Sequence, residues 1–335
     1  MRDHGPGGGQ RARRHAVSGL FVPLAGLLVA AVACSGALIN GSLINGSLVN
    51  GSLINGSAPA RATEPVNGEV LLAAASTPAA GLTDVVARID AMGASGPSEA
   101  EYGIAVLDRR TGQLTLGEEG AVPFYSASVV KLFTVVDILH RADVGTVSLT
   151  DTQRTQIQGA LRVSDNEAMN ALWEGFGGPR TVTELVGLAG LRDTRPPEQP
   201  GAWGNTRLSP RDVVAVYQYA LTKLSPANRD MVLSSLATPG TAGADGFNQS
   251  FGVLRTPGLP GAAGKQGWMR TRGNLYLHST GMVGTDHRYL VAMLSKQSAS
   301  VGYPAGRQRL DTAMGAVASA LGLLKGAAGV PGSSL

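Results

Sequence analysis

The sequence predicts an α+β domain in which the two ends of the domain supply one antiparallel sheet and the middle supplies a helical lobe. Residues 102–107 and 113–116 alternate in side-chain polarity as strands do. The pattern returns late in the chain at 275–278 and 289–294, whereas residues 128–224 place apolar side chains at helical spacing. Strands on both sides of a helical segment are typical of an α+β fold.

The domain is expected to open with a helix followed by a hairpin. In the first segment, apolar side chains fall at helical spacing at Leu82, Val85, Val86 and Ile89. Residues 93–97 break this helix. Turn-forming residues at 108–112 then join the first two strands into a hairpin.

Further helices are expected through the middle of the domain and at its end. The first covers residues 128–141 and carries an apolar stripe. Asp151 or Thr152 is expected to cap the second helix. The others are expected at 166–173, at 211–224 behind a Ser209-Pro210 start, and at about 307–321.

The N-terminus has the pattern of an export signal. Arginines within 11–14 precede an uncharged run at 16–33, so residues 1–33 are interpreted as a signal peptide. The run ends in Ala-Val-Ala-Cys, which resembles a bacterial lipobox and makes Cys34 the expected lipidation site. Cleavage without lipidation and an uncleaved anchor are the alternatives. All three place the domain outside the cytoplasm, and the lipidated form lies on the outer face of the membrane.

Residues 34–80 are interpreted as a tether. A five-residue repeat, Leu-Ile/Val-Asn-Gly-Ser, occurs four times between positions 38 and 57. Each copy carries an Asn-Gly pair that breaks a helix, and four copies are too few for a stable solenoid. An Ala-, Pro- and Thr-rich stretch continues to residue 80. The folded domain is therefore expected at 81–324, followed by a flexible tail at 325–335.

Composition excludes several function classes. The chain has 335 residues, a formal net charge of +4 and one cysteine. One cysteine excludes an intramolecular disulfide framework and a cysteine-based zinc cluster. The basic residues form no patch on the domain, so no nucleic-acid partner is expected. The five histidines follow no metal-ligand spacing, so neither a metal nor a cofactor is expected.

Ser128 and Lys131 stand three residues apart at a predicted helix start. Residues at this spacing share a helix face, so the amine can reach the hydroxyl. A serine hydroxyl needs a neighbour that takes its proton, and a lysine buried at a helix start has a lowered pKa. The free N–H groups of the helix start can also bind an oxyanion. A surface serine with a nearby cation is the alternative interpretation.

Two further short motifs follow in the chain. In Ser164-Asp165-Asn166, Ser164 can pass a proton to a leaving nitrogen and Asn166 can hold a substrate amide, although an ordinary helix cap also explains the triplet. In Lys265-Gln266-Gly267, expected in a loop before a strand, Lys265 supplies charge for a substrate carboxylate. Gly267 lets the substrate lie against the backbone.

These three motifs, in this order, resemble the Ser-x-x-Lys, Ser-Asp-Asn and Lys-Thr-Gly signatures of class A serine β-lactamases and penicillin-binding proteins. The resemblance covers about residues 81–324 and includes Phe124 and Ala127 just before Ser128. It implies a five-stranded antiparallel sheet flanked by helices, with an all-helical lobe. It also implies an oxyanion hole formed by the backbone N–H groups of Ser128 and Trp268.

The sequence departs from the family pattern in three ways. Gln266 replaces a threonine or serine that would help bind a substrate carboxylate. Ser128 and Ser164 are closer together than is usual, which implies a reduced helical lobe. The Glu-x-x-Leu-Asn segment that supplies the deacylating base is missing. Glu198 is the one candidate for that base in the corresponding loop, and its Pro-rich surroundings favour a simple surface loop.

Two hypotheses of function follow. In the first, the protein is an exported serine hydrolase that forms an acyl-enzyme with a β-lactam or a D-alanyl peptide, as a monomer and without a cofactor. In the second, it is a lipoprotein that keeps the fold and a peptidoglycan-facing groove but has weak or no turnover. The first hypothesis is the main one, and Gln266 and the missing glutamate are consistent with the second.

Overall fold

A computed structural model describes residues 81–94, 100–256 and 258–324. The predicted signal peptide, the tether with Cys34, and the C-terminal tail lie outside the described residues. None of the helices among the described residues combines the length and apolarity needed to span a bilayer.

The core of the domain is a five-stranded antiparallel sheet with strand order β2-β1-β7-β6-β5. Its strands are β1 (Ala100–Asp108), β2 (Gln113–Leu116), β5 (Ala263–Arg270), β6 (Asn274–Val283) and β7 (Tyr289–Ser298). β1 pairs with β7 along its whole length, with Ile104 opposite Met293. The first and last strands of the domain therefore lie side by side, as the sequence predicted, and the predicted fold class is confirmed.

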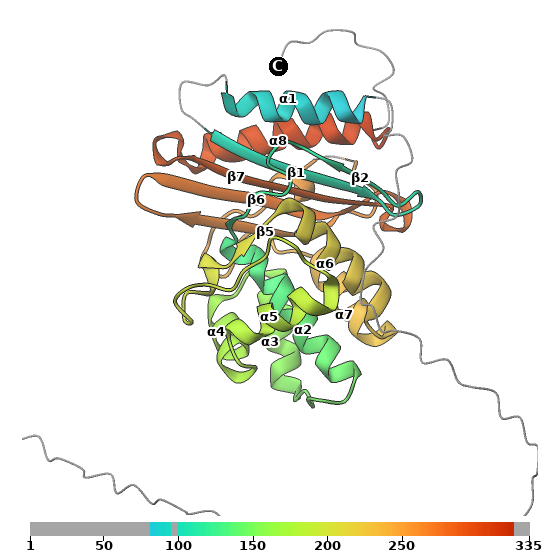
Figure 1. Cartoon of the computed structure of the whole chain (residues 1–335), viewed down its shortest axis with the longest axis vertical. Helices are drawn as coiled ribbons and strands as arrows, with labels where there is room; N and C mark the ends of the chain where they lie inside the picture. The colour runs from blue at the N-terminus through green and yellow to red at the C-terminus, as the bar shows by residue number, and fades with distance from the viewer. Residues whose placement is uncertain (1–80, 95–99, 257, 325–335) are drawn as a thin grey trace, which may run out of the picture. The chain divides into compact units, whose positions relative to one another are not determined.

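Helices cover both faces of the sheet (Figure 1). One face carries α1 (Leu82–Ala94) and α8 (Gly302–Ala320), which pack on each other. The helical lobe on the other side contains α2 (Val130–Asp143), α3 (Asp151–Arg162), α4 (Asn166–Gly175), α5 (Pro179–Ala189), α6 (Pro210–Lys223) and α7 (Pro226–Ala237). A two-stranded ribbon, β3 (Phe124–Tyr125) with β4 (Arg207–Leu208), lies where the chain enters and leaves the first part of this lobe.

Local sequence explains where the lobe helices begin. Ser209 accepts a hydrogen bond from the Asp212 N–H, with Pro210 in the first turn, as predicted. The predicted cap of α3 is wrong by one position, because Thr150 caps this helix. Thr150 and Gln153 form a reciprocal capping box, which satisfies two helix-end N–H groups at once.

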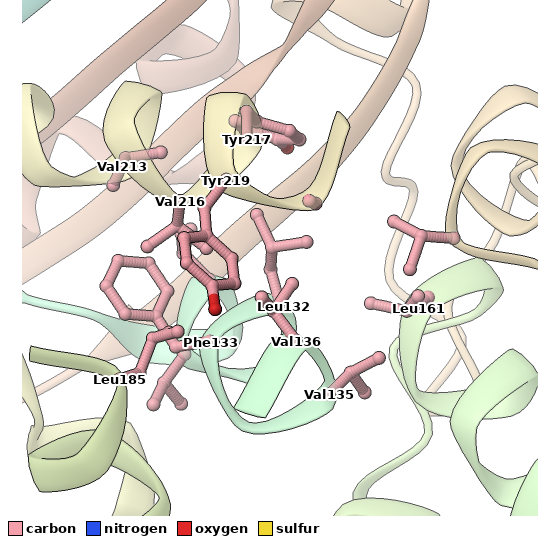
Figure 2. Packing of buried hydrophobic residues seen from close by; sticks show 14 of the residues in the cluster. Leu132, Phe133, Val135, Val136, Leu161, Leu185, Val213, Val216, Tyr217 and Tyr219 are labelled. Atoms are coloured by element: carbon pink, nitrogen blue, oxygen red, sulfur yellow. The ribbon is translucent and has the colours of Figure 1, made fainter. Parts of the chain in front are cut away.

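α2 is the central helix of the lobe. The sequence predicted an apolar stripe, yet every residue from Val130 to Leu139 is buried. A helix buried all round must be enclosed by other helices, and α2 packs against α5 and α6. Leu132, Phe133 and Val136 fill the space between them (Figure 2). This packing fixes α2 between α5 and α6.

Candidate active site

Ser128 lies in a single 3₁₀ turn, Ala127–Val129, that leads directly into α2. The turn begins with a strained residue, since Ala127 has φ of 45°. Such a backbone costs about 1–3 kcal/mol and persists where the surrounding structure enforces it. Lys131 sits in the first turn of α2, and its Nζ lies 3.1 Å from the Ser128 Oγ. The structure thus brings this predicted pair into contact.

Lys131 is completely buried and surrounded by oxygen atoms. Its Nζ donates to the Ser164 carbonyl at 2.6 Å and to the Asn166 Oδ1 at 2.7 Å. Burial lowers its pKa from 10.5 to about 7, and Asp245 and Asp165 partly oppose this shift. A neutral amine has two N–H groups and one lone pair. With both N–H groups on these two oxygens, the lone pair can accept the Ser128 proton.

Ser164 also has a left-handed backbone, with φ of 56°. Its hydroxyl lies 3.1 Å from the Lys131 Nζ and 2.9 Å from the Lys265 Nζ. Asp165 caps α4 by accepting hydrogen bonds from the N–H groups of Glu167 and Ala168. The cap interpretation therefore applies to Asp165. The Ser164 hydroxyl is not used for this cap and lies between the amines of Lys131 and Lys265.

Lys265 lies within β5, so its expected place in a loop before a strand is wrong. Its Nζ donates to the Ser164 Oγ and, at 2.9 Å, to the Gln266 carbonyl. Burial is the main cause of its lowered pKa, and Lys131 lowers it further. The backbone of Lys265 is also fixed. Its N–H donates to the Tyr217 hydroxyl at 3.1 Å, and its carbonyl accepts from Thr280 at 2.7 Å.

Gly267 permits a close approach within the protein itself. A Cβ at this position would lie 3.0 Å from Val129 Cγ2 and 3.1 Å from the Ser126 carbonyl. The sequence interpretation gave this glycine to substrate contact. In the structure its missing side chain lets β5 lie against the turn that carries Ser128, and its contact with a substrate stays a prediction.

A cavity of about 250 Å³ opens at this turn. Ser128, Asn166 and Trp268 line it, whereas Lys131, Ser164 and Lys265 lie behind its wall. The other lining residues are Ala127, Gly201, Ala202, Trp203, Gly204, Asn205, Asp245 and Met269. Glu198 is exposed and absent from this lining. Among the described residues, no group of three or more His, Cys, Asp or Glu side chains could hold a metal ion.

Trp203 is a site residue that sequence reasoning did not single out. The Lys131 Nζ lies 4.8 Å from the centre of its ring, and the Trp203 Nε1 donates to the Asn170 Oδ1 at 2.9 Å. No carboxylate of the described residues makes a hydrogen bond or ion pair with Lys131. An aromatic ring therefore stands beside the amine.

Gln266 points away from the cavity. Its Nε2 donates to the Phe251 carbonyl, its exposed fraction is 1%, and it does not line the cavity. In the described structure this side chain secures the segment before β5. The threonine or serine hydroxyl that the family pattern places at this point of the motif has no counterpart here.

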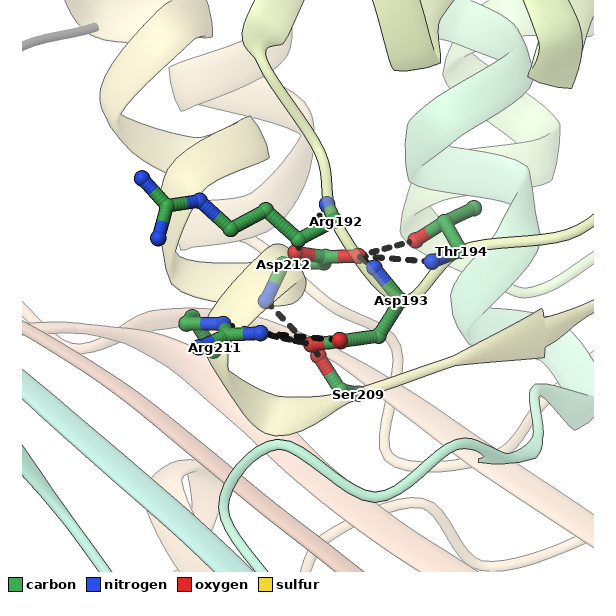
Figure 3. Close-up of polar contacts among 6 residues, drawn as sticks. All are labelled: Arg192, Asp193, Thr194, Ser209, Arg211 and Asp212. Carbon is green, nitrogen blue, oxygen red and sulfur yellow. Dashed lines mark hydrogen bonds and ion pairs between the residues drawn. The ribbon is translucent and has the colours of Figure 1, made fainter.

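The loop that carries Trp203 is anchored by a cluster that we call the loop anchor: Asp193, Thr194, Ser209, Arg211 and Asp212 (Figure 3). The buried Asp212 carboxylate accepts from three backbone N–H groups, those of residues 192–194, at 2.7 to 3.1 Å. The Thr194 hydroxyl adds a fourth hydrogen bond. Asp193 pairs with Arg211 and accepts from Ser209. Fixed donors of this kind hold the loop in one conformation.

Comparisons with known proteins agree with this architecture. A model of the β-lactamase enzyme family matches residues 84–158 and 152–323. The proposed lipoprotein LppW of Mycobacterium tuberculosis is 33% identical over 232 residues, which are 68% of this chain and 73% of LppW. Among solved structures, a β-lactamase from Sphaerobacter thermophilus matches with a TM-score of 0.56 and 18% identity, over 74% of this chain and 99% of that one. PBP-A matches with a TM-score of 0.58 and 21% identity, over 72% of this chain and 97% of that one. The family model and the relative together show that the chain belongs to the β-lactamase enzyme family.

Proposed function

We propose that this protein is an exported serine acyl-transfer enzyme in which Ser128 attacks an amide carbonyl of a β-lactam or a D-alanyl peptide. The observation that carries the proposal is the buried Lys131 amine, whose two N–H groups have fixed acceptors while the Ser128 hydroxyl lies 3.1 Å away. A neutral amine held in this way is a general base for its neighbour.

The proposed reaction begins when the Ser128 Oγ bonds to the carbonyl carbon and its proton passes to the Lys131 Nζ. The backbone N–H groups of Ser128 and Trp268 donate hydrogen bonds to the carbonyl oxygen and stabilise the negative charge that develops on it. As the C–N bond breaks, the proton moves from Lys131 through the Ser164 hydroxyl to the leaving nitrogen. Ser164 suits this role because its Oγ is within hydrogen-bond distance of both lysine amines. The product is an acyl ester on Ser128.

Release of the acyl group is proposed to be slow. A water molecule that attacks the ester needs a base, and in the part of the chain that the structure describes Trp203, rather than a carboxylate, stands beside Lys131. Glu198 is exposed and outside the cavity lining, so we assign it no role in this step. The second candidate function, a binding protein with weak turnover, rests on the same observation. The likeness to LppW supports attachment to the outer face of the membrane, with Cys34 as the proposed lipid site.

The test is labelling of the full chain with a fluorescent penicillin. We expect a covalent band with the native protein and none with Ser128→Ala, and a mass increase equal to the whole β-lactam. Hydrolysis of a chromogenic cephalosporin then separates a β-lactamase from a slowly deacylating protein. A native protein that never labels, although it binds the same penicillin reversibly, contradicts the enzyme and supports the binding protein.

A further inference from the structure

The Ser164 hydroxyl lies between amines that come from two different elements. Its side chain is buried, and its Oγ is within hydrogen-bond distance of Lys131 in α2 and of Lys265 in β5. The backbone of Ser164 is left-handed, a conformation that a residue other than glycine keeps only where the surrounding structure enforces it. The position of this hydroxyl therefore depends on the groups that fix the chain just before it.

Two carbonyl groups directly before Ser164 are bound from outside their own helix. Arg162 ends α3, and the last carbonyls of a helix have no partner within it. The Gln249 Nε2 donates to the Arg162 carbonyl at 2.9 Å. The Ala244 N–H donates to the Val163 carbonyl at 2.7 Å. The chain that leads into Ser164 is thus held by the segment that precedes β5.

Gln249 is the buried side chain of this contact, with an exposed fraction of 2%. Its Nε2 also donates to the Gly240 carbonyl at 2.6 Å. Both neighbours of the nitrogen are carbonyl oxygens, which only accept, so the amide must turn its NH₂ group toward them. Gln249 therefore ties the end of α3 at Arg162 to Gly240 through both N–H groups of one amide.

The same segment, residues 240–251, is also bonded to β5. The Gln266 Nε2 donates to the Phe251 carbonyl, and Gln266 directly follows Lys265 in the strand. Residues 240–251 thus bind both the chain before Ser164 and the strand that carries Lys265. These two partners meet where the Ser164 Oγ lies 2.9 Å from the Lys265 Nζ.

We propose that Gln249 is a positioning residue for proton transfer, which keeps the Ser164 hydroxyl where it can protonate the leaving nitrogen. This inference rests on the proposed function for its reaction. In that reaction the Ser128 Oγ bonds to the carbonyl carbon, the C–N bond breaks, and the proton from Ser128 reaches the nitrogen through Lys131 and Ser164. Without the hydrogen bond from Gln249, the backbone before Ser164 can relax and the hydroxyl moves out of this path.

The test compares two acyl donors whose leaving groups differ in their need for a proton. A penicillin expels an amine nitrogen, whereas the p-nitrophenyl ester of N-phenylacetylglycine expels a phenolate that leaves as the anion. Mass spectrometry follows the penicillin adduct at Ser128, and the absorbance of p-nitrophenolate follows the ester, with Ser128→Ala as background. Gln249→Met keeps the side-chain length and removes both N–H groups. We expect it to slow acylation by penicillin about tenfold and acylation by the ester less than about twofold.

A matched control and a double-mutant cycle distinguish positioning from loss of structure. Gln297 is also a buried glutamine, and its Nε2 donates to the Ser295 Oγ within β7. Gln297→Met should therefore keep the native ratio of the two rates. In a Ser164→Ala background, Gln249→Met should have no further effect, because a positioning residue acts through the residue that it positions.

Three outcomes of these measurements overturn the inference. They are an unchanged rate with penicillin in Gln249→Met, equal slowing of both donors, and a penicillin effect that persists in the Ser164→Ala background. If Gln249→Met does not fold, Gln249→Asn gives the same test, because its amide is one methylene shorter and cannot reach both carbonyls.

A crystal structure of the Gln249 variant separates failure of the inference from failure of the proposed function, because it needs no acylation. We expect the Ser164 Oγ to lose its hydrogen bond to at least one of the Lys131 and Lys265 amines. Distances that stay at the native 3.1 Å and 2.9 Å overturn the inference. A displaced hydroxyl, together with a native protein that reacts with neither donor, overturns the proposed function alone.

Discussion

Two polar clusters, one inside the helical lobe and one between the lobe and β5, satisfy their side chains in opposite ways. In the loop anchor, Asp212 receives three backbone N–H groups and one hydroxyl, all held by local structure. In the site cluster, defined as Ser128, Lys131, Ser164, Asn166 and Lys265, two amines share one hydroxyl. Every donor to Asp212 is held in one place, so this carboxylate cannot exchange hydrogen-bond partners. The loop anchor therefore stabilises the conformation of the loop. Shared donors and acceptors leave a path along which a proton can move.

The sharpest test of this contrast is Lys131→Met, which keeps much of the side-chain volume and removes the amine. We expect acylation of Ser128 to slow by about 10²- to 10⁴-fold, as for loss of a general base. The free energy of unfolding should change by less than about 2 kcal/mol, since relief of amine desolvation offsets the two oxygens left without a donor. Mass spectrometry and urea denaturation measure the two effects. A variant that acylates at the native rate removes Lys131 from the mechanism.

The matched change in the loop anchor is Asp212→Ala. It leaves one buried and two part-buried N–H groups without an acceptor, and also the Thr194 hydroxyl, so we expect a loss of about 3–5 kcal/mol of stability. Asp212→Asn keeps one carbonyl oxygen and should lose less. Urea denaturation of the three proteins measures this series. If Asp212→Ala costs no more than Lys131→Met, the two clusters do not differ as described.

The acylation rate and the stability of the protein should both depend on pH through the site cluster. The pKa of Lys131 is lowered from 10.5 to about 7, so the acylation rate should rise with pH through about 7 and then level off. Between about 7 and 10.5 the unfolded chain binds a proton that the folded protein does not, so native stability should increase with pH over this window. Below it, both states hold the proton. Lys131→Met should lack this part of the slope, and an unchanged slope contradicts the assignment.

The smallest expected effect is the change of stability with pH that Asp137 causes. This buried residue belongs to neither of the two clusters. Its carboxylate lies 3.1 Å from the Arg141 Nε but has no hydrogen-bond partner, and burial raises its pKa to about 7. Between 3.8 and about 7 the folded state holds an extra proton, so this group lowers stability as pH rises. We expect Asp137→Asn to gain about 2 to 3 kcal/mol relative to the native protein between pH 5 and pH 8, because about two pH units lie below the folded-state pKa in this range. Thermal melts at both pH values measure it, and an equal pH response of the two proteins counts against it.

The sequence predicted correctly those contacts of the site that are made between residues close together in the chain. The spacing of Ser128 and Lys131 predicted a shared helix face, and the Ser164-Asp165 pair contained a helix cap. Lys265 was placed in a loop because the residues around it are small or polar and show no alternation. The strand forms there because β6 and the turn before α2 bury it on both sides.

The residues that sequence reasoning missed come from distant segments. Trp203 reaches Lys131 from a loop fixed by Asp212, and Tyr217 reaches the Lys265 backbone from α6. Asp245 gave no signal, because a lone aspartate between glycines is typical of a turn. Packing across the chain, rather than spacing along it, makes these three residues part of the site.

The pairing of β1 with β7 also fixes the order in which a newly made chain can become reactive. Ser128 and Lys131 are synthesised long before β5, β6 and β7, which complete the wall behind them. A nascent or truncated polypeptide that lacks these last strands has no Lys265 beside Ser164 and cannot close the sheet. Fragments from premature termination or proteolysis are therefore expected not to be acylated, because Ser128 becomes an activated nucleophile only in the complete fold.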